Sequence, residues 1–321
     1  MGQLTGSLSR RSALKAAGAS LALSGCKKSA PPVTLTLGDQ KGGMQSLLEL
    51  SGELANLPYT IKWAQFGAAA PLFEALNAGA IDAGIGGDAP FVFFIATKPA
   101  ARAIAALSYV SVSPNEAGIL VRNESGISSI HDLVGKRVAA VRGSTGQYVT
   151  LAALRQAGLP LDAVRFAFLS PADSLTTLLN GGVDGWGAWE PYISIGELHY
   201  HLRPLDLPVA QLKGLGFIVA TNDAIAKKQS ALQEFLSRFS RARVWGAANK
   251  PEYAAGFAKD TGLPLDVAQR YVSEMNYEVV PIGTDSIADV QALADLYTQA
   301  KLLPAPVTVD FAFDRPFLAQ S

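Results

Sequence analysis

"LNAGAIDAGIGGDAP" at residues 76–90 and "LLNGGVDGWGAWEP" at residues 178–191 are two versions of one pattern. Each has a Leu-Asn pair, a glycine and a branched apolar residue before an aspartate, and an acidic residue six positions after that aspartate. The pattern is typical of a helix that ends at a glycine and passes into a short buried strand. Chance recurrence of a common connector is the alternative, but the segments that flank the two copies also match. We therefore expect two related α/β units.

Strand-like and helix-like segments alternate in two series, which begin at residues 33 and 116. This alternation predicts an α/β fold of two lobes, each a mainly parallel sheet flanked by helices. Because ligands bind beyond the carboxyl ends of such strands, the cleft between the lobes is the expected binding site. A strand expected at 216–222 closes the second series, and a mostly helical region follows. The expected lobes are residues 33–116 plus 222–321 for the first and 117–221 for the second, joined by segments near 113–118 and 214–222.

The composition fits a folded protein with balanced charge. Of 321 residues, 49% are hydrophobic and 17% are charged, with 27 Lys and Arg against 27 Asp and Glu. No basic excess is available to neutralise phosphates, so nucleic acid is not an expected partner. The one cysteine, Cys26, excludes an internal disulfide. The three histidines are scattered, so we expect neither a metal nor a cofactor. The alternative is that His199 and His201 lie on one strand and bind a metal together.

The first 26 residues indicate an export signal. Arg10 and Arg11 precede a mildly apolar stretch that ends in "LSGC", and no acidic residue occurs before position 39. A charged start, a short apolar run and small residues before a cut are typical of a bacterial signal peptide, and the run is too short for a permanent membrane span. "SRRSALK" resembles the twin-arginine motif, and "LSGC" resembles the lipoprotein box, in which the cysteine is acylated.

We therefore expect a signal peptide over residues 1–25, a lipidated Cys26 and a tether over 26–32. The alternative is an amphipathic N-terminal helix with a chance cysteine. Removal of the signal leaves 24 basic and 27 acidic residues, a net charge of −3.

Five segments of the chain resemble a known family. They are "LGDQKGG", "FEALNAGAIDAGIGGDAP", "DLVGKRVAAVRGSTGQYVTLAAL", "PADSLTTLLNGGVDGWGAWEPY" and "RARVWGAANKPEYAA". Together they resemble the periplasmic solute-binding proteins of ABC importers for aliphatic sulfonates, taurine and nitrate, with the sulfonate and sulfate-ester binders most similar. The resemblance covers nearly all of residues 33–310. It implies a two-lobed periplasmic-binding-protein (type II) fold and a monomer, lipid-anchored outside the cytoplasm, that passes a small organic anion to permease and ATPase subunits.

The resemblance also places the ligand pocket on a few loops of each lobe. It implies ligand contacts from Gln40, Phe66, Gly87, Asp88, Ala89, Gly143, Ser144, Thr145, Trp189 and Glu190. Two positions depart from the family pattern: "GAAAP" at 67–71 stands where a more polar loop is expected, and Glu190 stands where an aspartate is common.

The residue types at these positions suit an anion. "RGSTG" and "GGDAP" each lead into a helix, whose free N–H groups and dipole attract negative charge. Ser144 and Thr145 add hydroxyl donors, Gln40 adds an amide, and Trp189 and Phe66 offer apolar walls. Structural alternatives are a helix cap for Ser144, a core position for Trp189 and a solvent-facing Gln40.

Asp88 and Glu190 need a different explanation, since a carboxylate repels an anion. Either could hold a cationic part of a ligand such as taurine, pair with Arg142, or cap a helix.

The alternatives to a sulfonate binder keep the same fold. Other possible ligands are taurine, nitrate and a thiamine-precursor pyrimidine. Enzymes that resemble this family and cleave sulfinates use a cysteine nucleophile, whereas Cys26 lies in the export signal. Relatives that synthesise a precursor by consuming one of their own histidines are disfavoured too, because no histidine lies in a loop that matches the family's pocket. We therefore expect a binding protein with no catalytic residue.

Overall fold

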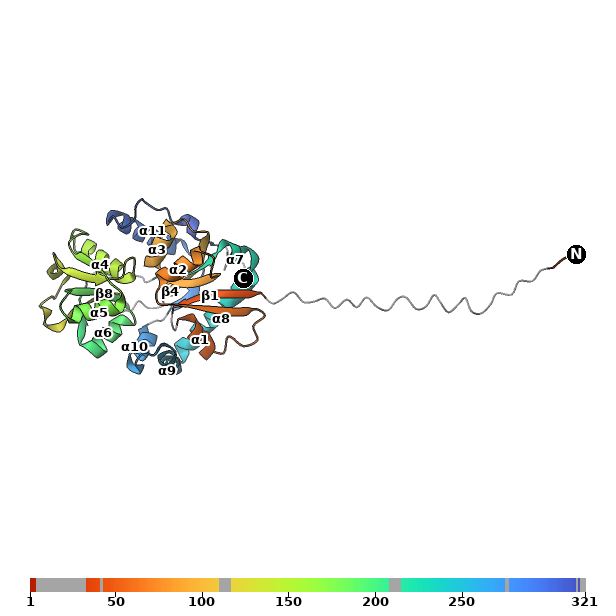
Figure 1. Cartoon of the computed structure of the whole chain (residues 1–321), viewed down its shortest axis with the longest axis horizontal. Helices are drawn as coiled ribbons and strands as arrows, with labels where there is room; N and C mark the ends of the chain where they lie inside the picture. The colour runs from red at the N-terminus through yellow and green to blue at the C-terminus, as the bar shows by residue number, and fades with distance from the viewer. Residues whose placement is uncertain are drawn as a thin grey trace. The chain divides into compact units, whose positions relative to one another are not determined.

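In the part of the chain that the structure describes, two β-sheets organise one compact unit, residues 33–321 (Figure 1). The computed structural model describes residues 1–3, 33–40, 43–109, 117–207, 215–274, 277–315 and 317. Cys26 and the predicted tether lie outside the described residues, as do the predicted signal peptide beyond residue 3 and most of the crossing segment expected near 113–118.

The first sheet has, among the described residues, six strands in the order β11-β4-β10-β3-β1-β2. β1 runs parallel to β2 and β3, β10 is antiparallel to β3 and β4, and β11 is antiparallel to β4. The strand bounds are Thr34–Gln40 (β1), Thr60–Phe66 (β2), Ala83–Gly87 (β3), Ala101–Tyr109 (β4), Gly216–Thr221 (β10) and Tyr277–Val280 (β11).

Helices cover both faces of the first sheet because its strands point successive side chains to opposite sides. On β10, Phe217 and Val219 pack into one apolar cluster with α2, α3 and α11, whereas Ile218 and Ala220 pack into another with α1, α8, α9 and α10. The helix bounds are Met44–Leu50 (α1), Ala69–Asn77 (α2), Asp88–Ala96 (α3), Asn222–Lys227 (α7), Gln229–Ala248 (α8), Lys250–Thr261 (α9), Leu265–Glu274 (α10) and Thr284–Gln299 (α11).

The second sheet has the order β7-β6-β8-β5-β9, with β6 parallel to β7 and β8, and β5 antiparallel to β8 and β9. Ile119 and Val121 face the cluster that holds α4, while Leu120 faces α5 and α6. The bounds are Ala117–Arg122 (β5), Arg137–Ala140 (β6), Thr145–Gln156 (α4), Arg165–Phe168 (β7), Pro171–Leu179 (α5), Gly185–Trp189 (β8), Tyr192–Tyr200 (α6) and Leu202–Pro204 (β9). Short 3₁₀ helices cover Asn123–Ser125, Ile130–Leu133 and Asp310–Ala312.

The doubled sequence pattern builds the same hydrogen-bonded junction in both sheets. The Asp82 N–H donates to the Thr36 carbonyl at 2.7 Å, and the Asp82 carboxylate accepts from the Thr36 N–H at 2.7 Å. Asp184 makes the same two bonds with Arg137, at 2.8 and 2.9 Å. Each aspartate ties the entry of β3 or β8 to its parallel neighbour, β1 or β6. The predicted α/β fold is thereby confirmed, and the recurring pattern has a structural cause.

One expectation is refined and two need correction. Among the described strands, four in each sheet point the same way, but the sheets are mixed, because β10 and β11 in the first sheet and β5 in the second run antiparallel to their neighbours. The strand at 216–222 is β10, which pairs with β3 and β4 in the first sheet and does not close the second series. The segment 199–201 ends α6, with His201 as its left-handed C-cap, so His199 and His201 do not alternate on a strand.

No helix in the described part of the chain is both long and apolar enough to cross a membrane.

Candidate ligand-binding site

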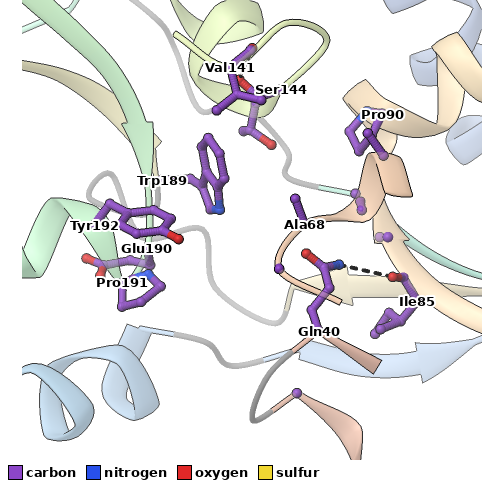
Figure 2. A pocket seen from close by; sticks show the side chains of 18 of the residues that line it. Gln40, Ala68, Ile85, Pro90, Val141, Ser144, Trp189, Glu190, Pro191 and Tyr192 are labelled. Carbon is purple, nitrogen blue, oxygen red and sulfur yellow. Dashed lines mark hydrogen bonds between the residues drawn. The ribbon is translucent and has the colours of Figure 1, made fainter. Parts of the chain in front are cut away.

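A cavity of about 350 Å³ is lined by residues from both sheets (Figure 2). Its walls come from loops that follow the carboxyl ends of β1, β2, β3, β6 and β8, together with residues of α9, α10 and β11. This is the edge at which open α/β sheets bind ligands. The volume is within the range of small-molecule sites, about 300–1,000 Å³.

Eight of the ten residues expected from the sequence line this cavity: Gln40, Gly87, Asp88, Gly143, Ser144, Thr145, Trp189 and Glu190. Phe66 and Ala89 do not. The Phe66 ring packs against the apolar cluster beneath α2 and α3, and Ala89 is fully buried in that same cluster. Residues 67–70, at the end of the loop and the start of α2, line the cavity with one glycine and three alanines, so this wall is apolar and small.

Carboxylates already occupy the N-termini of three helices beside the cavity. Asp39 accepts from the Met44 and Gln45 N–H groups at the start of α1, at 2.8 and 3.2 Å. Asp88 accepts from the Ala89 N–H of α3 at 2.6 Å. Glu190 accepts from the Ser194 hydroxyl of α6 at 2.9 Å. An anionic ligand placed at any of these helix starts would meet an occupied donor and a carboxyl group.

The N-terminus of α4 is different because its cap is a neutral hydroxyl. Ser144 accepts from the Gln147 N–H at 3.3 Å and donates to the Val141 carbonyl at 2.7 Å. The hydroxyl is therefore used within the turn, and the helix-cap interpretation of Ser144 is the one that the geometry supports. Thr145 lines the cavity next to it, and among the described residues neither its N–H nor its hydroxyl has a hydrogen-bond partner.

Gln40 lies across the cavity from Trp189, as Figure 2 shows. One amide N–H of Gln40 donates to the Ile85 carbonyl at 3.1 Å, which fixes the side chain and leaves its second N–H for a ligand. The Trp189 indole extends toward the side that Gln40 and Ala68 line, and the Tyr192 ring lies edge-on to it at 5.4 Å.

Glu190 is turned away from Gln40 in Figure 2 and is only 5% exposed. Burial raises the pKa of Glu190 to about 7, and the hydrogen bonds from Ser194 counteract part of that effect. The carboxyl therefore anchors the first turn of α6 and is partly protonated near neutral pH. Pairing with Arg142, one of the alternatives for this carboxyl, is not what the geometry shows, because the Arg142 guanidinium lies over the Phe168 ring, 3.8 Å from its centre.

Sequence reasoning missed the aromatic side chains that α6, α9, α10 and β11 bring to the cavity. These are Tyr192, Phe257, Tyr271 and Tyr277. Aromatic residues at such positions are typical of the core positions of helices and strands, so no local pattern distinguishes these four. No group of three or more His, Cys, Asp or Glu side chains in the described ranges could hold a metal ion.

Helices of the two sheets also touch beside the cavity. The Tyr148 ring of α4 lies 6.5 Å from the Tyr297 ring of α11. On α6 and α10, Glu197 pairs with Arg270, and His199 Nε2 lies 3.1 Å from Asp266 Oδ1. The hydrogen bond from His199 lowers the pKa of Asp266.

Two α/β sheets whose strand ends enclose one small cavity define the periplasmic-binding-protein fold. The family model described as "NMT1/THI5 like" matches residues 74–254, and the chain belongs to this family. This match and the relatives that follow confirm the resemblance to sulfonate-binding proteins drawn from the sequence. A curated protein of Escherichia coli (strain K12), named as an aliphatic sulfonates-binding protein, is 33% identical over 285 residues, which cover 87% of this chain and 88% of that protein.

Solved structures agree with this placement. The crystal structure of the periplasmic aliphatic sulphonate binding protein SsuA from Escherichia coli is 30% identical, with a TM-score of 0.79 over 90% of this chain and 100% of that chain. The alkanesulfonate-binding protein SsuA from Xanthomonas axonopodis pv. citri, solved bound to MOPS, is 29% identical with a TM-score of 0.79, over 89% of this chain and 100% of that one. The desulfurization enzyme DSZB, at 16% identity, shares the fold alone.

Proposed function

We propose that this chain is the extracytoplasmic solute-binding component of an ABC importer, and that it captures a small organic sulfonate or sulfate ester. The relatives named for binding sulfonates support this proposal, as does the cavity between the sheets. A sulfonate stays anionic at any physiological pH, so its site needs hydrogen-bond donors and no titrating base.

The N-terminus of α4 carries the proposal, because its neutral hydroxyl cap leaves the positive end of the helix dipole available to the ligand. In the proposed complex the sulfonate oxygens accept from the Thr145 N–H and hydroxyl. The second amide N–H of Gln40 donates from the opposite wall. The carbon body of the ligand then lies against Trp189.

The two sheets are the cores of two lobes that we propose close over the ligand. β10 belongs with the first lobe on this view, since it is paired on both edges there. Closure about hinges is a common response of such proteins to a ligand. Compaction in small-angle scattering on addition of a bound sulfonate is the expected result, and an unchanged radius of gyration would contradict it.

The N-terminal residues complete the proposal as an export signal and a lipid anchor at Cys26. The proposed role is that of a binding protein and not an enzyme. Pure protein should therefore return a bound sulfonate unchanged.

Calorimetric titration tests the function and the site together. The panel holds alkanesulfonates, aryl sulfonates, sulfate esters, taurine, nitrate and a thiamine-precursor pyrimidine. We expect a sulfonate or sulfate ester to bind most tightly, and tight binding of nitrate or the pyrimidine with no response to any sulfonate would refute the proposal.

Thr145→Val keeps the shape of the side chain and removes its hydroxyl. Loss of a hydrogen bond to a charged group costs about 1.5–3 kcal/mol, so binding should weaken about 10- to 140-fold. Thr176→Val, an exposed exchange on α5 outside the cavity, is the matched control. Equal ligand affinities in the two variants would show that the Thr145 hydroxyl does not bind the ligand.

A further inference from the structure

One part of the cavity is walled by aromatic rings that a short aliphatic ligand would not use. Trp189 and Tyr192 come from the second sheet and its helix α6, and Phe257, Tyr271 and Tyr277 come from α9, α10 and β11. We call these five residues the aromatic compartment. In Figure 2, the Tyr192 ring lies on the far side of Trp189 from Ser144 at the α4 N-terminus.

The rings of the compartment are held in place by their own packing. Phe257 and Tyr271 are stacked with ring centres 4.6 Å apart and planes at 2°. The Arg243 guanidinium covers Tyr277, 3.7 Å from the ring centre, and the Tyr192 and Trp189 rings are perpendicular with centres 5.4 Å apart. Preorganised rings lose little side-chain entropy when a ligand arrives, so their contacts contribute fully to affinity.

The size of the cavity points the same way. The cavity volume, about 350 Å³ before any closure of the lobes, leaves room for a ligand larger than nitrate. An unfilled apolar space beside a short ligand would forfeit dispersion contacts with its lining.

We infer that the aromatic compartment takes an aromatic ring, so that the ligand of this chain is an aryl sulfonate or an aryl sulfate ester. This inference rests on the proposed function, because the –SO₃⁻ group common to both ligands is placed at the α4 N-terminus. Offset or edge-on ring contacts contribute about 0.5–1.5 kcal/mol beyond the apolar area that they bury, which is about 2- to 12-fold in affinity.

The aromatic compartment draws its rings from both sheets. Trp189 belongs to the second sheet, while Phe257 and Tyr271 belong to helices packed on the first. A flat ring bound in the compartment would then have aromatic partners from both sheets once the –SO₃⁻ group is bound. A saturated ring of the same carbon number would fill the space without this match.

The test is a calorimetric comparison of benzenesulfonate, cyclohexanesulfonate, butanesulfonate and phenyl sulfate with the purified protein. We expect benzenesulfonate or phenyl sulfate to bind at least 2-fold more tightly than cyclohexanesulfonate and about 10-fold more tightly than butanesulfonate. The better of the two aryl ligands identifies the sulfonate or the sulfate ester as the source of the –SO₃⁻ group.

Three variants complete the test. Tyr192→Leu and Trp189→Leu replace half-buried rings at the cavity wall with aliphatic side chains, and both should abolish the preference for the aromatic ring over the saturated one. Trp245→Leu exchanges a half-buried tryptophan of α8 outside the cavity and should keep that preference. Circular dichroism checks that each variant is folded, and two cavity variants are used so that misfolding of one leaves the other to decide.

The outcomes separate the two proposals. Butanesulfonate or cyclohexanesulfonate binding as tightly as benzenesulfonate and phenyl sulfate would overturn the aromatic inference and leave a sulfonate-binding protein. Binding of no sulfonate or sulfate ester would overturn both. An aryl preference that persists in both cavity variants would show that the compartment is not its source and would also overturn the inference.

Discussion

The buried carboxyl of Glu190 should make the stability of this protein depend on pH. Burial raises the pKa of Glu190 from 4.5 to about 7 in the folded state. A raised folded-state pKa favours the protonated form, so the stabilising contribution is fully present below pH 4.5 and is lost as the pH rises through 7. At 1.36 kcal/mol per pKa unit, the complete loss is about 3 kcal/mol.

Glu190→Gln is the perturbation that isolates this contribution. The amide has nearly the same shape, still accepts from the Ser194 hydroxyl and does not titrate. Urea unfolding at pH 5 and pH 8 should show the wild type losing about 2–3 kcal/mol more than the variant between the two pH values. Glu278→Gln, an exposed exchange on β11 outside the cavity, is the matched control. Parallel pH profiles of wild type and Glu190→Gln would refute the reasoning.

Three further predictions concern the close α4–β8 contact, the doubled pattern and the anchor. Gly146→Ala should destabilise the protein by at least about 3 kcal/mol in urea unfolding, because an added Cβ would lie 2.0 Å from the Gly187 carbonyl oxygen; a folded variant of wild-type stability would contradict this. Asp82→Asn should lower the free energy of unfolding by about 1–3 kcal/mol, and by more than Asp184→Asn does, because Asp82 also pairs with Lys228 at 2.8 Å. Equal losses in the two variants would show that this ion pair adds no stability. A fatty-acid analogue should label wild type and not Cys26→Ala, and equal labelling would exclude acylation at this cysteine.

The recurrence at 76–90 and 178–191 was enough to predict two α/β units, because the connector from helix to strand that it encodes is local. The bonds of Asp82 and Asp184 to Thr36 and Arg137 on the parallel neighbour join residues far apart in the sequence and became visible only in the structure. The local sequence at 216–222 did not indicate which of the two sheets this strand joins. Ile218 is paired with Ile85 and Ala105, more than 100 residues away, and a buried strand has the same local pattern in either sheet.

The residues of the candidate site also divide into those that the sequence predicts and those that only the structure reveals. Gln40, Thr145 and Trp189 could be placed because they follow strands, and the strand ends of such sheets meet at one edge. Phe257 and Tyr271 reach the cavity only through the packing of α9 and α10, which their own sequence does not specify. The sequence also left the hydroxyl of Ser144 open between a ligand donor and a helix cap, since both roles need the same residue at the same position.

A crystal structure of the protein with a bound organosulfonate tests the central claim most directly. We predict that the sulfonate oxygens lie within 2.7–3.2 Å of the Thr145 nitrogen or hydroxyl at the N-terminus of α4, with the carbon body against Trp189. A sulfonate seated instead at the start of α3 beside Asp88, or outside the cavity, would contradict the account.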